Sequence, residues 1–395
     1  MVFQVDQTRG PGRIKEENMP KVSVIVPTYN VEQYLEECME SLVNQTLRDM
    51  EFVCVNDGST DHSLDILKKY AAKDARVRIL DGPNGGYGKA MNRGLDACTG
   101  EYVGIVEPDD YVKTDMYEKL YQIARKKDLE IVKADFYRFV EGKDGKQVFT
   151  YNRLTPEDSM YDRVLDPKED VDVFKAVMNT WSGIYKRSFL IENHIRHNET
   201  PGASFQDNGF WFQTFCYTKR LWFVGRPYYR NRRDNPNSSV HSREKVFCMN
   251  DEYAFIREFL DTHPVFKERY LAIYHFRRYH NYVASLYRVG EEYKDIYMER
   301  FQREFMEADE NGELEASVFT PKEWELVQIL LKDRHAYVYE ERIYRVGIEK
   351  DWEIERLQRE LENVENSTSY KVGKAVMFLP CVVKEWILRM KRDHE

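Results

Sequence analysis

Acidic residues follow a short apolar stretch that begins at Tyr102. Residues 102–106 suit a buried strand, and Pro108 cannot donate a backbone hydrogen bond, so we expect the strand to end before Asp109 and Asp110. Ligands of open α/β sheets bind where strands end, and adjacent carboxylates there suit a divalent cation such as Mn²⁺ or Mg²⁺. The alternative is that these carboxylates only cap the next helix.

Strand-like and helix-like stretches alternate along the first third of the chain. Residues 22–27, 51–55 and 77–80 are apolar and β-rich, and each run is followed by a polar loop and then by apolar residues at helical spacing. Residues 131–136 are a further expected strand. This repetition predicts a right-handed parallel sheet whose ligand-facing loops gather on one edge.

The loop after residues 77–80 lacks both common phosphate-binding fingerprints. A P-loop needs glycine where Pro83 stands and a hydroxyl residue where Ala90 follows Lys89. The dinucleotide fingerprint is also absent, and residues 27–30 occupy its expected place. A cation on the acidic pair is therefore the candidate for holding a diphosphate.

Linked motifs give the chain a resemblance to a known family. They are VIVPTYN at 24–30, NDGSTD at 56–61, NGG at 84–86 with NRG at 92–94, and EPDD at 107–110. Their order and spacing over residues 20–215 resemble family 2 glycosyltransferases of the GT-A fold. The resemblance implies an α/β fold, with a Rossmann-like mixed sheet and flanking helices. It also implies inverting transfer of a sugar from a nucleotide-sugar donor, usually a UDP-sugar, to a glycan or lipid-linked acceptor.

The resemblance further implies a nucleotide-binding set. Pro27, Thr28 and Tyr29 would line the base and ribose, and Asp57 would accept the uracil N3–H. The loop of residues 84–89, through Asn84, Gly86 and Lys89, would close over the ribose and diphosphate together with Asn92.

The metal site implied by the resemblance lies in the EPDD motif. Asp110 would be the principal metal ligand, and Asp109 would contact the ribose or the metal. The family commonly has Asp where this chain has Glu107, whose longer side chain can still reach a metal directly or through water. His241 is a further candidate ligand, although a lone histidine is more often structural.

A downstream carboxylate, Asp207, is the candidate catalytic base. Direct displacement needs a base that takes the acceptor hydroxyl's proton, and the family's Glu-Asp motif is represented here by Gln206 and Asp207. Because Gln206 is neutral, we expect the pKa of Asp207 to stay unraised. The alternative is that Asp207 only caps a helix starting at Gly209.

Basic and aromatic residues near this motif have two interpretations each. Arg230 and Arg232 follow the strand-like residues 221–224 and could neutralise the departing diphosphate, or form structural ion pairs in a solvated turn. Trp181 could stack on a sugar or pack in the core.

Composition narrows the class of protein. The 395-residue chain is 42% hydrophobic and 14% aromatic, as expected for a globular protein, and its formal charge of −9 argues against nonspecific nucleic-acid binding. The 6 cysteines lie far apart with no CxxC pair, which predicts reduced thiols in a cytoplasmic protein. The first 20 residues lack an apolar signal region, and no run reaches transmembrane length.

The expected organisation has four parts. Residues 1–20 form a loose leader, and residues 21–245 form the GT-A domain, divided into a nucleotide-sugar part (21–140) and an acceptor part (141–245). Residues 246–335 form an α-helical extension, and residues 336–395 form coiled-coil-like and amphipathic helices. The C-terminal helix mixes apolar residues with cations, which favours either contact with the inner face of the plasma membrane or docking on protein. A homodimer is a further expectation.

The family's setting suggests synthesis of a bacterial surface polysaccharide. Two alternatives remain open. Glu107 and Gln206 motivate a catalytically inactive sugar-binding or scaffold module. A sugar nucleotidyltransferase would need a basic phosphate loop after the first strand, and residues 27–30 do not supply one.

Overall fold

The computed structural model describes residues 19–372 except 143–144, 204, 237, 239–241 and 244. The leader before residue 19, His241 and the tail from residue 373 therefore lie outside the described residues. The chain divides into two compact units, the first made of Met1–Phe301 with Glu307–Val318 and the second of Gln302–Met306 with Phe319–Glu395.

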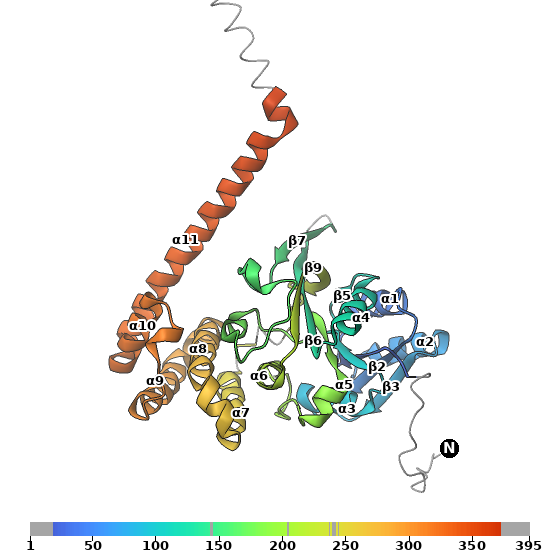
Figure 1. Cartoon of the computed structure of the whole chain (residues 1–395), viewed down its shortest axis with the longest axis horizontal. Coiled ribbons are helices and arrows are strands. Elements are labelled where there is room, and N and C mark those ends of the chain that lie inside the picture. The colour runs from blue at the N-terminus through green and yellow to red at the C-terminus, as the bar shows by residue number, and fades with distance from the viewer. Residues whose placement is uncertain are drawn as a thin grey trace, which may run out of the picture. The chain divides into compact units, whose positions relative to one another are not determined.

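The first unit begins with the expected alternation of strands and helices (Figure 1). Parallel pairing joins β1 to β2 and β4, and β2 to β3. All seven residues of β1 are buried, as its apolar sequence requires in a sheet covered on both faces. The elements are β1 (Val22–Thr28), α1 (Leu35–Val43), β2 (Met50–Asp57), α2 (Ser63–Lys73), β3 (Val77–Gly82), α3 (Tyr87–Ala97) and β4 (Tyr102–Ile105).

The sheet becomes mixed beyond β4. Its strand order is β3-β2-β1-β4-β8-β6-β9-β5, with β7 paired to β6, and β8 is antiparallel to both β4 and β6. The α/β mixed sheet with flanking helices is therefore confirmed. The elements here are β5 (Tyr111–Val112), α4 (Met116–Lys127), β6 (Ile131–Glu141), β7 (Gln147–Asn152), β8 (Gly183–Lys186), α5 (Arg187–Glu192), α6 (Asp207–Tyr217) and β9 (Leu221–Arg232), with 3₁₀ turns at Asp158–Met160 and Val171–Lys175.

Strand β9 is longer than the sequence predicted. It continues past residue 224 to Arg232, so Arg230 and Arg232 lie within the sheet and not in a turn after it. Residues 229–232 pair in parallel with residues 136–139 of β6, beyond a register shift near residues 134–136. Pairing with β6, which is distant in the sequence, therefore extends β9 through its polar residues.

The expected helical extension is present as α7 (Cys248–Thr262), α8 (Pro264–Arg288) and α9 (Lys294–Glu310). Helix α6 is buried almost all round because α7 packs against it, and it carries large apolar side chains such as Phe210, Trp211 and Phe212. Helix α6 is therefore an internal element of the first unit, and Asp207 is its first residue.

The second unit contains α10 (Pro321–Lys332) and α11 (Arg334–Asn366). Thr320 and Glu323 form a capping box at the start of α10, and the Asp333 side chain accepts backbone N–H bonds at the start of α11. Apolar residues at the 3-4-3 spacing of a coiled-coil seam lie exposed on α11 in this single chain, namely Ile354, Leu357, Leu361 and Val364.

Two further findings concern the helices and the cysteines of the described residues. None of the helices within the described residues is long and apolar enough to span a bilayer. The cysteines in this part of the chain are free thiols, namely Cys38, Cys54, Cys98, Cys216 and Cys248.

A buried lysine lies in the middle of the sheet. Lys133 on β6 is fully buried, and its Nζ donates to the Asn179 carbonyl at 2.7 Å and to the Tyr185 hydroxyl at 3.2 Å. Burial lowers the pKa of Lys133 to about 7. In the unfolded chain the lysine keeps its proton up to a pKa of about 10.4. The buried lysine therefore destabilises the folded state fully below pH 7, and this penalty shrinks as the pH rises from 7 toward the unfolded value.

We therefore predict that replacing Lys133 by Met removes one pH-dependent contribution to stability. The free energy of unfolding of the wild type, relative to that of Lys133→Met, should rise by about 2 kcal/mol between pH 7 and pH 9. Urea unfolding at several pH values measures this difference. Lys126→Met, at an exposed position of α4, is the control and should keep the wild-type pH dependence. Parallel curves for wild type and Lys133→Met would contradict the prediction.

Candidate active site

The loops after β1 and β2 are bonded to each other at one edge of the sheet. The Thr60 amide donates to the Asn30 side-chain oxygen at 2.8 Å, and the Asn30 amide donates to the Ser59 hydroxyl at 3.2 Å. Asn30 adopts a left-handed conformation, with φ of 51°, which asparagine tolerates better than most residues. Beside this junction, Thr28 is buried, whereas Tyr29 is 49% exposed and free to contact a ligand.

Asp57, at the end of β2, holds the start of α3. Its two carboxylate oxygens accept hydrogen bonds from the Gly85 and Gly86 amides, each at 2.9 Å. A carboxylate here also complements the positive end of the α3 helix dipole. Each carboxylate oxygen keeps a second lone pair, so Asp57 can still accept a hydrogen bond from a ligand.

Residues 197–202 pack directly against the start of α3. A Cβ on Gly88 would lie 1.8 Å from the Asn198 carbonyl oxygen, and one on Gly86 would lie 2.8 Å from the Gly202 nitrogen. Asn92 joins the same two segments, because its amide donates to the His197 carbonyl at 3.0 Å and its oxygen accepts from the His197 amide at 2.9 Å. Asn92 is thus used within the protein, whereas Lys89 and Asn84 are exposed.

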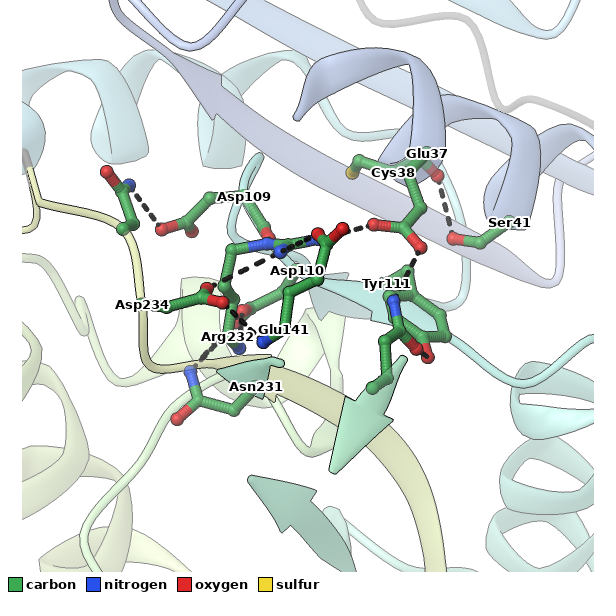
Figure 2. Close-up of polar contacts among 12 residues, drawn as sticks. Glu37, Cys38, Ser41, Asp109, Asp110, Tyr111, Glu141, Asn231, Arg232 and Asp234 are labelled. Carbon is green, nitrogen blue, oxygen red and sulfur yellow. Dashed lines mark hydrogen bonds and ion pairs between the residues drawn. The ribbon is translucent and has the colours of Figure 1, made fainter. Parts of the chain in front are cut away.

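The two aspartates after β4 have different surroundings (Figure 2). Asp110 is 2% exposed and accepts from the Arg232 amide at 2.6 Å and from the Asn231 side chain at 3.1 Å, so both of its oxygens are bonded to β9. Asp109 is less buried and accepts from the Asn235 side chain at 2.8 Å. Burial, followed by the charge of Asp109, raises the pKa of Asp110 well above its usual value.

The two arginines of β9 are engaged within the protein. The Arg232 guanidinium pairs with Glu37 of α1 at 2.6 Å and with Asp234 at 3.4 Å, and it donates to the Asp109 carbonyl at 3.1 Å (Figure 2). Arg230 lies over the Tyr137 ring at 4.6 Å and donates to backbone carbonyls. Arg232 thus forms structural ion pairs, but both arginines lie within β9 and not in a solvated turn.

Glu107, the first residue of the EPDD motif, is bonded to two tyrosines. It accepts a hydrogen bond from the Tyr87 hydroxyl at 2.7 Å, and its amide donates to the Tyr229 hydroxyl at 3.0 Å. Burial raises the pKa of Glu107 to about 8, and the nearby charges of Asp109 and Asp207 add to this effect. Glu107 is thus electrostatically coupled to both halves of the site.

The expectation of an unraised pKa for Asp207 is wrong. Burial raises the pKa of Asp207, and the hydrogen bond from Asn208 at 3.2 Å offsets only part of that effect. The Gln206 side chain is directed instead at the preceding loop, donating to the Thr200 carbonyl at 3.1 Å and the Gly202 carbonyl at 2.9 Å. A raised pKa brings a carboxylate base closer to the pH at which it must accept a proton.

The donor set of this site fits a cation shared with a ligand. Within the described residues, no group of three or more His, Cys, Asp or Glu side chains is arranged to hold a metal ion. Mg²⁺, however, is commonly bound through one or two carboxylates together with substrate phosphates. Asp109 fits such a role better than Asp110, because Asp110 is committed to β9. His241 lies outside the described residues.

Some polar residues of the site were missed by sequence reasoning. The Tyr87 hydroxyl and the buried Glu252 on α7 carry no local sequence signal, because they reach the site through tertiary packing. Trp181 stacks on Tyr229 with ring centroids 4.3 Å apart and remains partly exposed. It is therefore at least a packing residue.

We predict that Gly88→Ala disrupts this site through its fold. The new methyl group would overlap the Asn198 carbonyl, so the free energy of unfolding should fall by about 1–3 kcal/mol in urea titrations. Gly225→Ala is the matched control, because its Cβ would lie 3.6 Å from Tyr161, which is an ordinary contact. Equal stability of Gly88→Ala and the wild type would rule out this packing of α3 on residues 197–202.

Comparison with known proteins identifies the family of this arrangement. Residues 23–180 match the family model described as glycosyl transferase family 2. The chain is 35% identical over 226 residues to the uncharacterized glycosyltransferase EpsJ of Bacillus subtilis, covering 56% of this chain and 63% of EpsJ. It is 33% identical over 220 residues to the glycosyltransferase GlyG of Streptococcus pneumoniae, covering 54% of this chain and 70% of GlyG.

A solved structure shares the fold. Residues 1–349 of S. aureus TarS superimpose with a TM-score of 0.55 at 22% identity, over 83% of this chain and 92% of that one. The matched family model, the relative GlyG and this shared architecture lead to one conclusion: the chain belongs to the family 2 glycosyltransferases.

Proposed function

We propose that the chain transfers a sugar from a UDP-sugar to a glycan or lipid-linked hydroxyl, with inversion at the anomeric carbon and with Mn²⁺ or Mg²⁺ as cofactor. The observation that carries this proposal is the position of Tyr87, whose hydroxyl donates to Glu107 of the acidic motif and whose amide donates to the Gly202 carbonyl in the loop before Asp207. The acidic motif and the loop that precedes the candidate base are thus joined through one residue, which supports a phosphate-directed carboxylate and a base serving one in-line transfer.

The nucleotide would lie along the ends of β1 and β2. Tyr29 is exposed for stacking on the base, and Asp57 keeps lone pairs for a uracil N–H. TarS, which shares the fold, has been crystallised with UDP and with UDP-GlcNAc. This supports a UDP-sugar as the donor.

The diphosphate would lie beside Asp109, with a divalent cation between them. When bound, such a cation offsets the charge that grows on the departing diphosphate. Asp109 would hold the cation, while Asp110 fixes β9 below it. Lys89 and Arg233 are exposed, whereas Arg232 is paired with Glu37 and Asp234 and Arg230 lies over the Tyr137 ring, so Lys89 and Arg233 are the cations better placed to face phosphate.

Asp207 would remove the proton from the acceptor hydroxyl. Its position at the start of α6, its partial burial and its raised pKa support a general base. Matches of 40% identity over 100 residues to a chondroitin synthase and a hyaluronan synthase of Pasteurella multocida support polysaccharide synthesis as the setting.

We predict that Asp207→Asn abolishes transfer and spares donor binding. An amide cannot accept the proton, so the rate of UDP release from UDP-GlcNAc, UDP-glucose or UDP-galactose should fall about 100-fold or more. The donor dissociation constant from calorimetry should stay within about twofold. Asp65→Asn, an exposed change on α2, is the control. An unchanged rate would remove Asp207 from the base role, and a wild type that binds donors without releasing UDP would favour a sugar-binding module.

We also predict that substitutions of the two aspartates after β4 have different effects, one on donor binding and one on stability. Asp109→Asn should abolish the Mn²⁺-dependent gain in donor affinity, of about tenfold or more, without unfolding the protein. Asp110→Asn should instead lower the free energy of unfolding by about 1–3 kcal/mol, because it disturbs buried hydrogen bonds to β9. The reverse pattern would make Asp110 the metal ligand.

A further inference from the structure

Hydrogen bonds join α7 and α8 to the start of α6. On α7, Glu252 is 1% exposed, and its Oε1 accepts from the Gly209 amide at 2.7 Å. Its Oε2 accepts from the Asn198 side chain at 2.9 Å. One buried carboxylate of the helical extension therefore holds both the first turn of α6 and the segment that packs on Gly88.

A second path reaches Asp207 itself. The Asn281 side chain on α8 donates to the Asn208 side-chain oxygen at 2.8 Å and to the Tyr253 hydroxyl at 2.7 Å. The Asn208 oxygen is held by Asn281, and the Asn208 amide nitrogen donates to the Phe205 carbonyl at 2.9 Å and to Asp207 Oδ1 at 3.2 Å. Asn208 is 1% exposed, so an alternative orientation of its amide would lack water to replace these bonds.

These contacts lie outside the segment that defines the family. The family model ends at residue 180, whereas Glu252 and Asn281 belong to α7 and α8. Because α6 is buried almost all round, the rotation of its first turn depends on what α7 and α8 bond to. A carboxylate base must be positioned closely, since a small displacement lowers the rate by about 10²-fold in unfavourable cases.

We propose that Glu252 and Asn281 are positioning residues that orient the Asp207 carboxylate toward the acceptor hydroxyl. This inference rests on the proposed function of Asp207 as base. Neither residue touches the reacting atoms, because each acts through α6: Asn281 through the Asn208 amide and Glu252 through the Gly209 amide. The helical extension is thereby part of the catalytic apparatus of this chain.

The expected signature is a loss of turnover with donor binding retained. Asn281→Leu keeps the side-chain size and removes the donor to Asn208, so kcat for UDP release should fall about tenfold or more while the KM for the donor stays within about twofold. Tyr253→Phe leaves the hydrogen bond between Asn281 and Asn208 in place, so it should lower kcat less than Asn281→Leu does.

Glu252 supplies a rescue test. Glu252→Leu leaves the Gly209 amide without an acceptor and should lower kcat, whereas Glu252→Gln keeps an oxygen for that amide and should restore kcat to within about threefold of the wild type. Arg257→Gln is the control for general loosening of α7. It breaks a paired contact with Glu313 at 2.6 and 2.8 Å and has none of these bonds to α6, so it should lower thermal stability and spare kcat.

The outcomes distinguish the positioning role of Glu252 and Asn281 from the base role of Asp207. If Asp207→Asn abolishes UDP release but Asn281→Leu and Glu252→Leu keep kcat within about twofold, the positioning role is overturned and the base role stands. The same holds if Arg257→Gln lowers kcat as much as these variants do for the same loss of thermal stability. If Asp207→Asn keeps the wild-type rate, or if the wild type releases UDP from no donor, the proposed function fails and the inference fails with it.

Discussion

A carboxylate buried at the end of a strand needs N–H donors, because taking the charge out of water costs several kcal/mol. In this chain the donors come from segments far away in the sequence. Asp57 accepts from the start of α3, and Asp110 accepts from the Arg232 amide on β9. These bonds fix the loops at the edge of the sheet relative to each other. The acidic residues of the motifs are thus structural links as well as candidate ligands.

The site combines two different environments. At the proposed nucleotide side, Tyr29 and Lys89 are exposed, as would suit a donor that enters and leaves. At the side of the proposed base, burial raises the pKa values of Glu107 and Asp207. The apolar helix α6 creates the second environment, because it is enclosed by other elements and carries Asp207 at its first turn. Enclosure raises the carboxyl pKa and holds its orientation at the same time.

Sequence reasoning succeeded where the signal is local and failed where it depends on packing. The strands up to β4 were predicted because apolar runs and polar loops alternate over short distances. The end of β9 was missed, since pairing with β6 and aromatic contacts of Arg230 and Arg232 stabilise polar residues in a strand. The pKa of Asp207 was misjudged because its neighbour in sequence, Gln206, has less influence than the burial of α6.

The sequence by itself determined the α/β order of elements, the polar loops that follow the strands and the linked motifs that give the family. These are properties of residue type and spacing along the chain. Only the tertiary structure decided which aspartate is tied to β9, which arginines are already paired, and that Glu252 and Asn281 reach the start of α6. Such contacts join residues tens to more than a hundred positions apart, and their direction is set by how helices and strands pack, which no short pattern records.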